Sequence, residues 1–262
     1  MKVVDLSKSI QYNSNDPRFM RVRVKHKPHW IARWLVRALG LPFKLMPKDF
    51  VGWADDTITH MGVHSTTHID APWHYGPKSG EPGQETDALT VEHIPLDKCI
   101  GPGVVIDMTG KEEGDVITAD DLQSELTRTG AMVKEGTIVL IRTGRDRYMG
   151  TKDYWKRGTG MGAEATSWLI DQGCVVMGID QWGWDIPFHH QIDQSKKNGK
   201  DDLFWEGHRL GQRRPYWQME QLVNLGSLPA DGFKVCVFPL KLVGASAAPA
   251  RVVAIFDEDV AA

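Results

Sequence analysis

The sequence predicts an α/β fold. Strand-like apolar runs at 104–108, 137–141 and 174–179 alternate with helical segments in the middle of the chain, which is the pattern of an α/β sheet. The length of 262 residues is long for one domain but remains within the range of an α/β domain. The sequence shows no repeat, low-complexity segment or interdomain linker, so we expect one domain over residues 1–262.

The N-terminal part of the chain predicts two short strands, at 2–6 and at Phe19–Val24, joined by a polar loop. Residues 30–46 begin with an amphipathic helix that ends at Gly40. This helix could be a lid over a site, a dimer contact, a helix on a membrane surface or simply another packed helix. Only two arginines line its polar face, which favours a lid or a dimer contact over a membrane helix.

Later elements begin and end at recognisable signals. Thr118 and Asp121 resemble a capping box with Asp in place of Glu, which predicts a helix through Leu126. A second helix is expected over Ala163–Gln172, closed by Gly173. The remaining expected elements are a Gly- and Pro-rich loop at 76–87 and two final strands at 235–242 and 251–256.

Composition narrows the possible partners. Hydrophobic residues make up 41% of the chain and charged residues 25%, as in ordinary globular proteins, and the net charge of −3 offers no basic surplus for nucleic acid or anionic lipid. The three cysteines, Cys99, Cys174 and Cys236, are far apart and are expected to be reduced core residues. The sequence has no apolar signal core at its start and no apolar run of about 18 residues, so we expect a cytoplasmic protein outside the membrane.

One stretch concentrates groups that bind metals or move protons: His64-Ser-Thr-Thr-His68-Ile-Asp70-Ala-Pro72-Trp-His74. All four such groups occupy even positions, which share one face of an extended chain, and Pro72 argues against a continuous helix. A straight strand, at about 3.3 Å per residue, would hold the Cα atoms of residues 64 and 68 roughly 13 Å apart. We therefore expect a bend between His64 and His68, with His68 and Asp70 side by side on a short strand. The alternative is a polar patch on an edge strand.

This stretch resembles the signature H-x-G-T-H-x-D-A-P-x-H of the metal-dependent cyclase-like hydrolases, which include bacterial kynurenine formamidases, isatin hydrolases and trans-dienelactone hydrolases. Thr66 stands where that family usually has Gly. Residues 5–7, 238–244 and 248–251 resemble the family's opening and closing motifs. The resemblance implies a single domain with a mixed sheet, the swivelling β/β/α cyclase-like fold, in which residues 30–46 are a helical insertion.

The resemblance also implies a metal site and a proton carrier. Its metal ligands would be His64, His68, Asp70, His208 and Glu220. Asp70 and Glu220 would bridge two ions, although a surface His and an exposed Glu remain the alternative for the distal pair of His208 and Glu220. His74 matches the family's general acid/base. Imidazole and carboxylate ligands suit Zn²⁺ best and Mn²⁺ next, as one or two ions.

The stretch from 181 to 206 is rich in aromatic residues. Four tryptophans could wall an aromatic pocket: Trp73, Trp182, Trp184 and Trp205. The adjacent pair His189 and His190 could suggest a further metal site, but neighbouring residues on a strand face opposite ways. We interpret these two histidines as loop residues.

The function implied is hydrolysis of a C–N amide bond (a formamide or cyclic amide) or a lactone bond, in a small aromatic or cyclic substrate, by metal-activated water. The sequence contains neither a G-x-S-x-G elbow nor a phosphate-binding loop. Two alternatives stay open: a cyclase that closes a ring at the same site, and a non-catalytic, zinc-stabilised ligand-binding protein. The expected partners are a small-molecule substrate and other copies of the chain, as a homodimer or higher homo-oligomer, without nucleic acid or membrane.

Overall fold

The computed structural model describes residues 1–199 and 203–257. Its contacts divide the chain into two units, one made of residues 1–9 with the chain from residue 63 onward, and the other of residues 10–62. The larger unit holds the main sheet and every residue expected at the metal site. The sequence-based expectation of a single domain stays a prediction.

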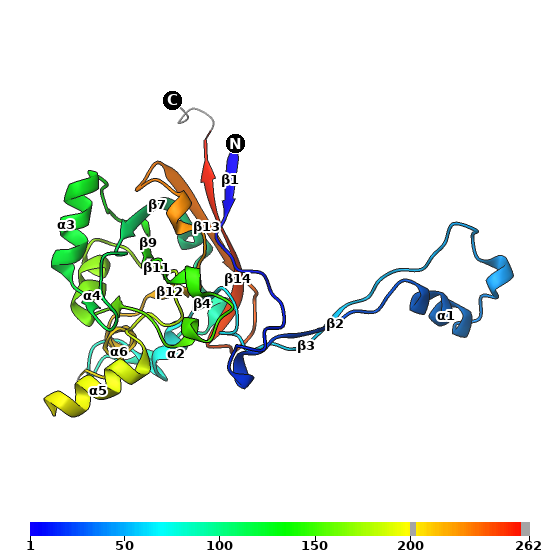
Figure 1. The fold of residues 1–262 in the computed structure, drawn as a ribbon, viewed down its shortest axis with the longest axis horizontal. Helices are drawn as coiled ribbons and strands as arrows, with labels where there is room; N and C mark the ends of the chain where they lie inside the picture. Colours follow the sequence, from blue (N-terminus) through cyan, green and yellow to red (C-terminus); the bar gives the residue numbers. More distant parts are fainter. Residues whose placement is uncertain (200–202, 258–262) are drawn as a thin grey trace. The chain divides into compact units, whose positions relative to one another are not determined.

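In the described part of the larger unit, seven strands of one sheet close into a ring (Figure 1). The sheet order is β1-β14-β13-β7-β9-β11-β12-β4, and β4 also pairs with β14, which closes the ring; β1 pairs with the last four residues of β14. β7, β9, β11 and β12 run parallel and the other pairings are antiparallel, so the expected α/β fold with a mixed sheet is confirmed. The strands are β1 (Lys2–Asp5), β4 (His68–Asp70), β7 (Ile100–Asp107), β9 (Ile138–Arg142), β11 (Val176–Ile179), β12 (Trp217–Glu220), β13 (Phe233–Pro239) and β14 (Ala247–Phe256).

Successive side chains of the strands face opposite sides of the sheet, and each side has its own hydrophobic core. One cluster takes side chains from all seven strands of the ring, among them Val105 and Leu140, and fills its interior. Neighbouring residues of the same strands, such as Val104 and Val139, face the other way. There they pack under the helices α3 (Ala119–Thr129) and α4 (Ala163–Asp171), which lie on the same side of the sheet in Figure 1. The sheet is therefore buried on both faces where the parallel strands lie.

The structure confirms where the sequence predicts that the two helices begin. The Thr118 side chain accepts a hydrogen bond from the Asp121 N–H while Asp121 bonds back to the Thr118 N–H, a complete capping box. The helix α3 runs three residues beyond the expected Leu126, until Gly130 adopts a left-handed conformation with φ 75°. The chain leaves α4 through Gly173, with φ 83°.

Shorter elements complete the larger unit. Its other helices are α2 (Pro72–Tyr75), α5 (Phe188–Asn198) and α6 (Glu206–Arg213), and its short strands are β5 (Lys78–Ser79), β6 (Thr86–Asp87), β8 (Val116–Ile117) and β10 (Gly160–Met161). Its 3-10 helices are η3 (Val91–His93), η4 (Leu96–Cys99), η5 (Arg145–Tyr148), η6 (Asp153–Trp155) and η7 (Leu225–Ser227). The expected loop at 76–87 contains the small hairpin β5–β6.

Two expectations about individual residues need correction. His189 and His190, expected in a loop, lie in the first turn of α5, after Pro187 as the residue that precedes the helix. Cys99 and Cys174 are buried as expected, whereas Cys236 in β13 is only partly buried. All three thiols are free.

The smaller unit consists of a hairpin and a helix: β2 (Arg23–Lys25), β3 (Thr57–His60), α1 (Trp30–Ala38) and the 3-10 helices η1 (Arg18–Met20) and η2 (Phe43–Leu45). The expected helix after residue 30 is confirmed. The expected strand at Phe19–Val24 is confirmed only at its end: its first residues form η1 after Pro17, and strand pairing starts at Arg23.

Large apolar side chains of α1 are exposed within this unit. Trp30 is 60% exposed, Trp34 is 61% and Leu35 is 50%, although Trp34 makes an edge-to-face contact with Phe43 at 5.0 Å between ring centroids. Exposed apolar surface of this kind is typical of an interaction site. Across the described residues, no helix has the length and apolar character needed to span a membrane. The cytoplasmic location, and the role of the helix as a lid, dimer contact or membrane-surface helix, stay predictions.

If α1 is the dimer contact, Trp34→Glu should lower the molar mass in light scattering, because it places a charge in the exposed apolar face of this helix. Arg37→Glu, on an exposed position of the same helix, is the control and should leave the mass unchanged. Tight binding of the wild-type protein to anionic lipid vesicles, with no change of mass in Trp34→Glu, would instead favour the membrane-surface alternative.

Candidate metal centre

The register of three strands brings the polar residues of the site together. β4 lies between β12 and β14, and in the antiparallel pair with β12 Asp70 stands opposite Gln218, while His68 stands opposite Glu220. The residue between each pair packs into the core of the ring. Because side chains alternate along a strand, these four polar side chains share the other face of the sheet.

A bend before β4 returns His64 to the same place, as the sequence predicts. Nδ1 of His64 lies 3.1 Å from Nε2 of His68. The bend is held by Gln221, the residue after β12, whose side-chain amide donates to the His64 carbonyl at 2.7 Å while its own carbonyl accepts from the Thr67 hydroxyl at 2.6 Å. Gln221 is fully buried and has φ 59°, a left-handed conformation that is uncommon for a residue other than glycine.

His74 reaches the site on a helical turn, which corrects the expectation of an extended chain through residue 74. Pro72 is the first residue of α2, a position where its fixed φ suits a helix and its missing N–H costs nothing. The turn places His74 Nε2 4.0 Å from Asp70 Oδ2, and the ring centroids of His74 and His64 are 4.2 Å apart. His74 therefore joins the cluster from a different element than the other three residues of the stretch.

The three proximal groups, His64, His68 and Asp70, form a nearly regular triangle of ligand atoms. Asp70 Oδ1 lies 3.0 Å from His64 Nδ1 and 3.1 Å from His68 Nε2, and the two nitrogens are 3.1 Å apart. Nδ1–H of His68 donates to the Thr66 carbonyl at 2.7 Å, so in the neutral ring the lone pair of Nε2 points at the triangle. Among the described residues, the buried Asp70 Oδ1 has no hydrogen bond.

This triangle fits a metal ion. Ligand atoms about 2.0–2.1 Å from a tetrahedral ion lie about 3.3 Å from one another, close to the observed edges. Lone pairs that converge on a buried carboxylate oxygen repel one another unless a cation lies between them. The bond from His68 to the Thr66 carbonyl is the kind of outer contact that orients metal-binding histidines.

The surrounding charges shift the pKa values of the site. Burial raises the pKa of Asp70, but the nearby imidazoles of His74, His68 and His64 outweigh it, and the pKa lies well below its usual range. Burial lowers the pKa of His68, yet the attraction of Asp70 leaves it raised. Burial, together with the charge of Asp70, raises the pKa of Glu220. Burial also lowers the pKa of His74 to about 4, despite the attraction of Asp70, so this imidazole is neutral near pH 7.

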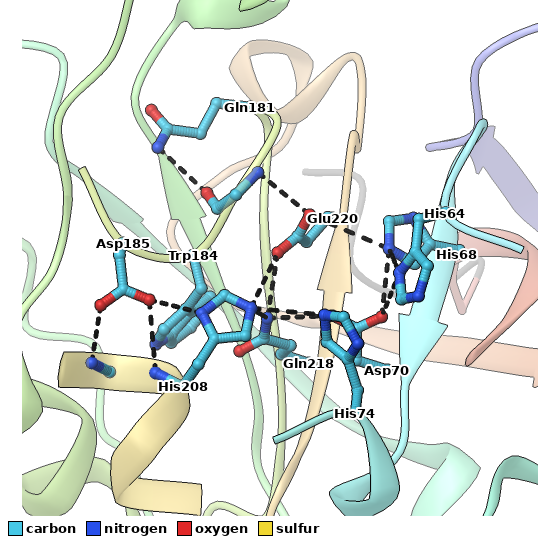
Figure 2. Close-up of polar contacts among 12 residues, drawn as sticks. His64, His68, Asp70, His74, Gln181, Trp184, Asp185, His208, Gln218 and Glu220 are labelled. Atoms are coloured by element: carbon cyan, nitrogen blue, oxygen red, sulfur yellow. Dashed lines mark hydrogen bonds and ion pairs between the residues drawn. The ribbon is translucent and has the colours of Figure 1, made fainter. Parts of the chain in front are cut away.

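The distal pair is buried beside the proximal triangle, and Figure 2 shows Gln218 between His208 and Asp70. His208 comes from α6, and its Nδ1 bonds to Asp185, which also accepts from the Gly207 N–H at 2.6 Å. The Gln218 amide nitrogen lies 2.8 Å from His208 Nε2. Because His208 and Glu220 are each only 4% exposed, the alternative of a surface His and an exposed Glu is wrong.

The four tryptophans do not form one pocket wall. Trp205 stacks on His208 with 4.4 Å between ring centroids and meets His74 edge to face at 5.5 Å, so it borders the site. Trp184 lies fully buried in the core under the helices, where its indole N–H donates to the Thr166 hydroxyl. Trp182 packs against Trp155 and Phe188. The expectation of an aromatic pocket is therefore wrong for Trp184.

Besides the proximal triangle, two overlapping groups of donors among the described residues lie close enough to hold an ion: His64 with Asp70 and His74, and His68 with Asp70 and Glu220. His189 and His190 belong to neither group. Sequence reasoning missed Gln218 and Asp185, which hold Asp70 and His208. The only indication in the sequence was the alternation of side chains along a strand. Gln218 is two residues before Glu220, so the two side chains must lie on the same face.

The chain is similar to known proteins in sequence and in fold. A family model described as "Putative cyclase" matches residues 4–186, which include the 64–74 stretch and end before His208. The kynurenine formamidase of Paracidovorax citrulli is 29% identical over 194 residues, covering 74% of this chain and 76% of that protein. The isatin hydrolase of Roseibium aggregatum is 26% identical over 205 residues, covering 74% and 72%. The solved structure of isatin hydrolase A from Ralstonia solanacearum has a TM-score of 0.70 and 25% identity, covering 98% of this chain and 92% of that one.

We expect His74 to make the free energy of unfolding of the metal-free protein decrease as the pH falls. Its pKa is about 4 when folded, against an ordinary 6.5, so the unfolded chain takes up this proton first as pH falls. The stabilisation is complete above the ordinary pKa and is lost as pH falls towards the folded one. His74→Gln, which does not titrate, should show a smaller loss of unfolding free energy in urea between about pH 7 and about pH 5. An equal loss in both proteins would contradict the assignment.

Proposed function

The chain belongs to the cyclase family, and on this basis we propose that it is a metal-dependent hydrolase of a small aromatic or cyclic substrate. The bond cleaved is a C–N amide, in a formamide or a cyclic amide, or else a lactone. The kynurenine formamidase and isatin hydrolase among its relatives support an amide. The observation that carries the proposal is the triangle of His64 Nδ1, His68 Nε2 and Asp70 Oδ1, whose edges of 3.0–3.1 Å suit one ion.

The residues around the triangle have separate roles in this proposal. His64, His68 and Asp70 hold the ion, which is Zn²⁺ or Mn²⁺ on the evidence of its mixed imidazole and carboxylate ligands. When bound, such an ion polarises a carbonyl group and lowers the pKa of bound water to about 7. Glu220 lies next to the triangle, with Oε2 3.8 Å from His68 Nε2 and held by the Gly183 N–H at 3.0 Å. Glu220 and His208 are the remaining donors of the predicted ligand set.

His74 is the proposed general acid/base. Its low pKa keeps the imidazole unprotonated near neutral pH, as the acceptor of a proton must be. Trp205, edge to face with this ring, limits the access of water on one side and offers an aromatic surface to the substrate. A cyclase would use the same groups in the direction of ring closure. A structural zinc site has no need of such a proton carrier, which favours an enzyme over a non-catalytic binding protein.

Removal of metal should abolish the activity. Hydrolysis of a panel of N-formyl anilines, cyclic amides and lactones should stop after dialysis against a chelator, and Zn²⁺ or Mn²⁺ should restore it. Full turnover by protein that is shown to be metal-free would refute the proposed function.

His74→Ala should lower turnover by about 10²–10⁴, the usual range for the loss of a general acid/base, while bound metal stays near the wild-type amount. His190→Ala is the control, because this histidine lies on α5 outside the cluster. A loss of metal together with activity in His74→Ala would make His74 a ligand, a role for which its position beside His64 and Asp70 also qualifies it.

A further inference from the structure

The side-chain amide of Gln218 occupies the centre of the distal group. Its nitrogen lies 2.8 Å from His208 Nε2, 3.0 Å from Asp70 Oδ2 and 3.0 Å from Glu220 Oε1. All four residues are at most 4% exposed. These three acceptors are the atoms that would have to bind a second ion.

The orientation of this amide follows from its surroundings. Its oxygen accepts from the Tyr216 hydroxyl at 2.8 Å, whereas a flipped amide would direct the oxygen at two carboxylates. The nitrogen, with its two hydrogens, is therefore the end that faces His208, Asp70 and Glu220. It supplies the partial positive charge that these buried acceptors need.

The spacing of the acceptors fits an amide better than an ion. His208 Nε2 lies 3.6 Å from Glu220 Oε1 and 4.0 Å from Asp70 Oδ2. The proximal triangle, with edges of 3.0–3.1 Å, is tighter. Ligands about 2.0–2.1 Å from one tetrahedral ion stand about 3.3 Å apart, whereas hydrogen bonds of about 2.9 Å to a central nitrogen need a wider spacing.

We propose that the Gln218 amide takes the place of a second cation, so that the chain holds one ion, at His64, His68 and Asp70. Gln218 is then a positioning residue, because its bond to Asp70 Oδ2 leaves Oδ1 directed at the two proximal histidines. His208, fixed by Asp185 on its other nitrogen, in turn holds Gln218. This inference rests on the proposed function for the first ion, and it assigns the distal pair to hydrogen bonding and not to metal binding.

Metal content tests the inference directly. The full-length protein is loaded with excess Zn²⁺ or Mn²⁺, dialysed, and measured for metal per chain. Wild type should hold one ion, and its Mn²⁺ form should give the electron paramagnetic resonance spectrum of an isolated ion. Gln218→Glu replaces the donor with a carboxylate among three acceptors, so it should bind a second ion and give the spectrum of a coupled pair.

The control is Gln212→Glu, which places the same change on α6, at a side chain that donates to the Tyr75 carbonyl outside the distal group. It should keep one ion. Gln218→Ala, which also removes the donor, serves as the second variant if Gln218→Glu does not fold, and it should likewise gain an ion.

Two ions in the wild-type protein, or a coupled Mn²⁺ pair, would overturn this inference and leave the proposed function intact. A folded Gln218 variant that still holds one ion would also overturn it. No bound ion in the wild-type protein would overturn both proposals.

Discussion

The site depends on one buried carboxylate whose two oxygens have different partners. Asp70 directs Oδ1 at the nitrogens of His64 and His68 and Oδ2 at the amide of Gln218. A carboxylate without solvent needs partners for both oxygens, and only one of these two has a hydrogen-bond donor in the described residues. The cost of leaving the other unpaired is the physical reason why we propose a cation in the triangle. The rest of the cluster, from the bend at Thr67 to the bond between Asp185 and His208, serves to hold the atoms around this carboxylate.

The sheet gives this arrangement its rigidity. His68 and Asp70 come from β4, and Gln218 and Glu220 come from β12, with backbone pairing that fixes the distance between them. The ring closure through β14 holds the other edge of β4. Ligands on paired strands are positioned more accurately than ligands on loops, because a shift of one would have to break the ladder. His74 and His208 come from the short helices α2 and α6 and lie against the polar side chains of these paired strands.

Much of the site could be predicted from the sequence because its signal was local. The even spacing of His64, His68 and Asp70 and the Pro after them specified a bend and a strand, and both are present. The role of Pro72 was misjudged, since a residue that prevents a helix from continuing can also begin one. Gln218 could not be identified, because its importance comes from a partner 148 residues away in the chain and from a bond to His208 that no spacing rule describes. Trp184 was misplaced for the same reason, since only the packed structure shows that its ring is in the core.

The pairing of β4 also determines when the site can exist. β4 contributes three residues to the ring, yet its neighbours are β12 and β14, and β14 is the last strand of the described residues. Pairings between such distant segments form slowly, because the entropy of closing the intervening chain must be lost before the contacts stabilise it. During synthesis on the ribosome, the strand that carries Asp70 can therefore pair on both edges only after β14 has been made. The candidate metal centre therefore needs β14 as well as β4, and a product that stops before β14 carries His64, His68 and Asp70 without the framework that brings them together.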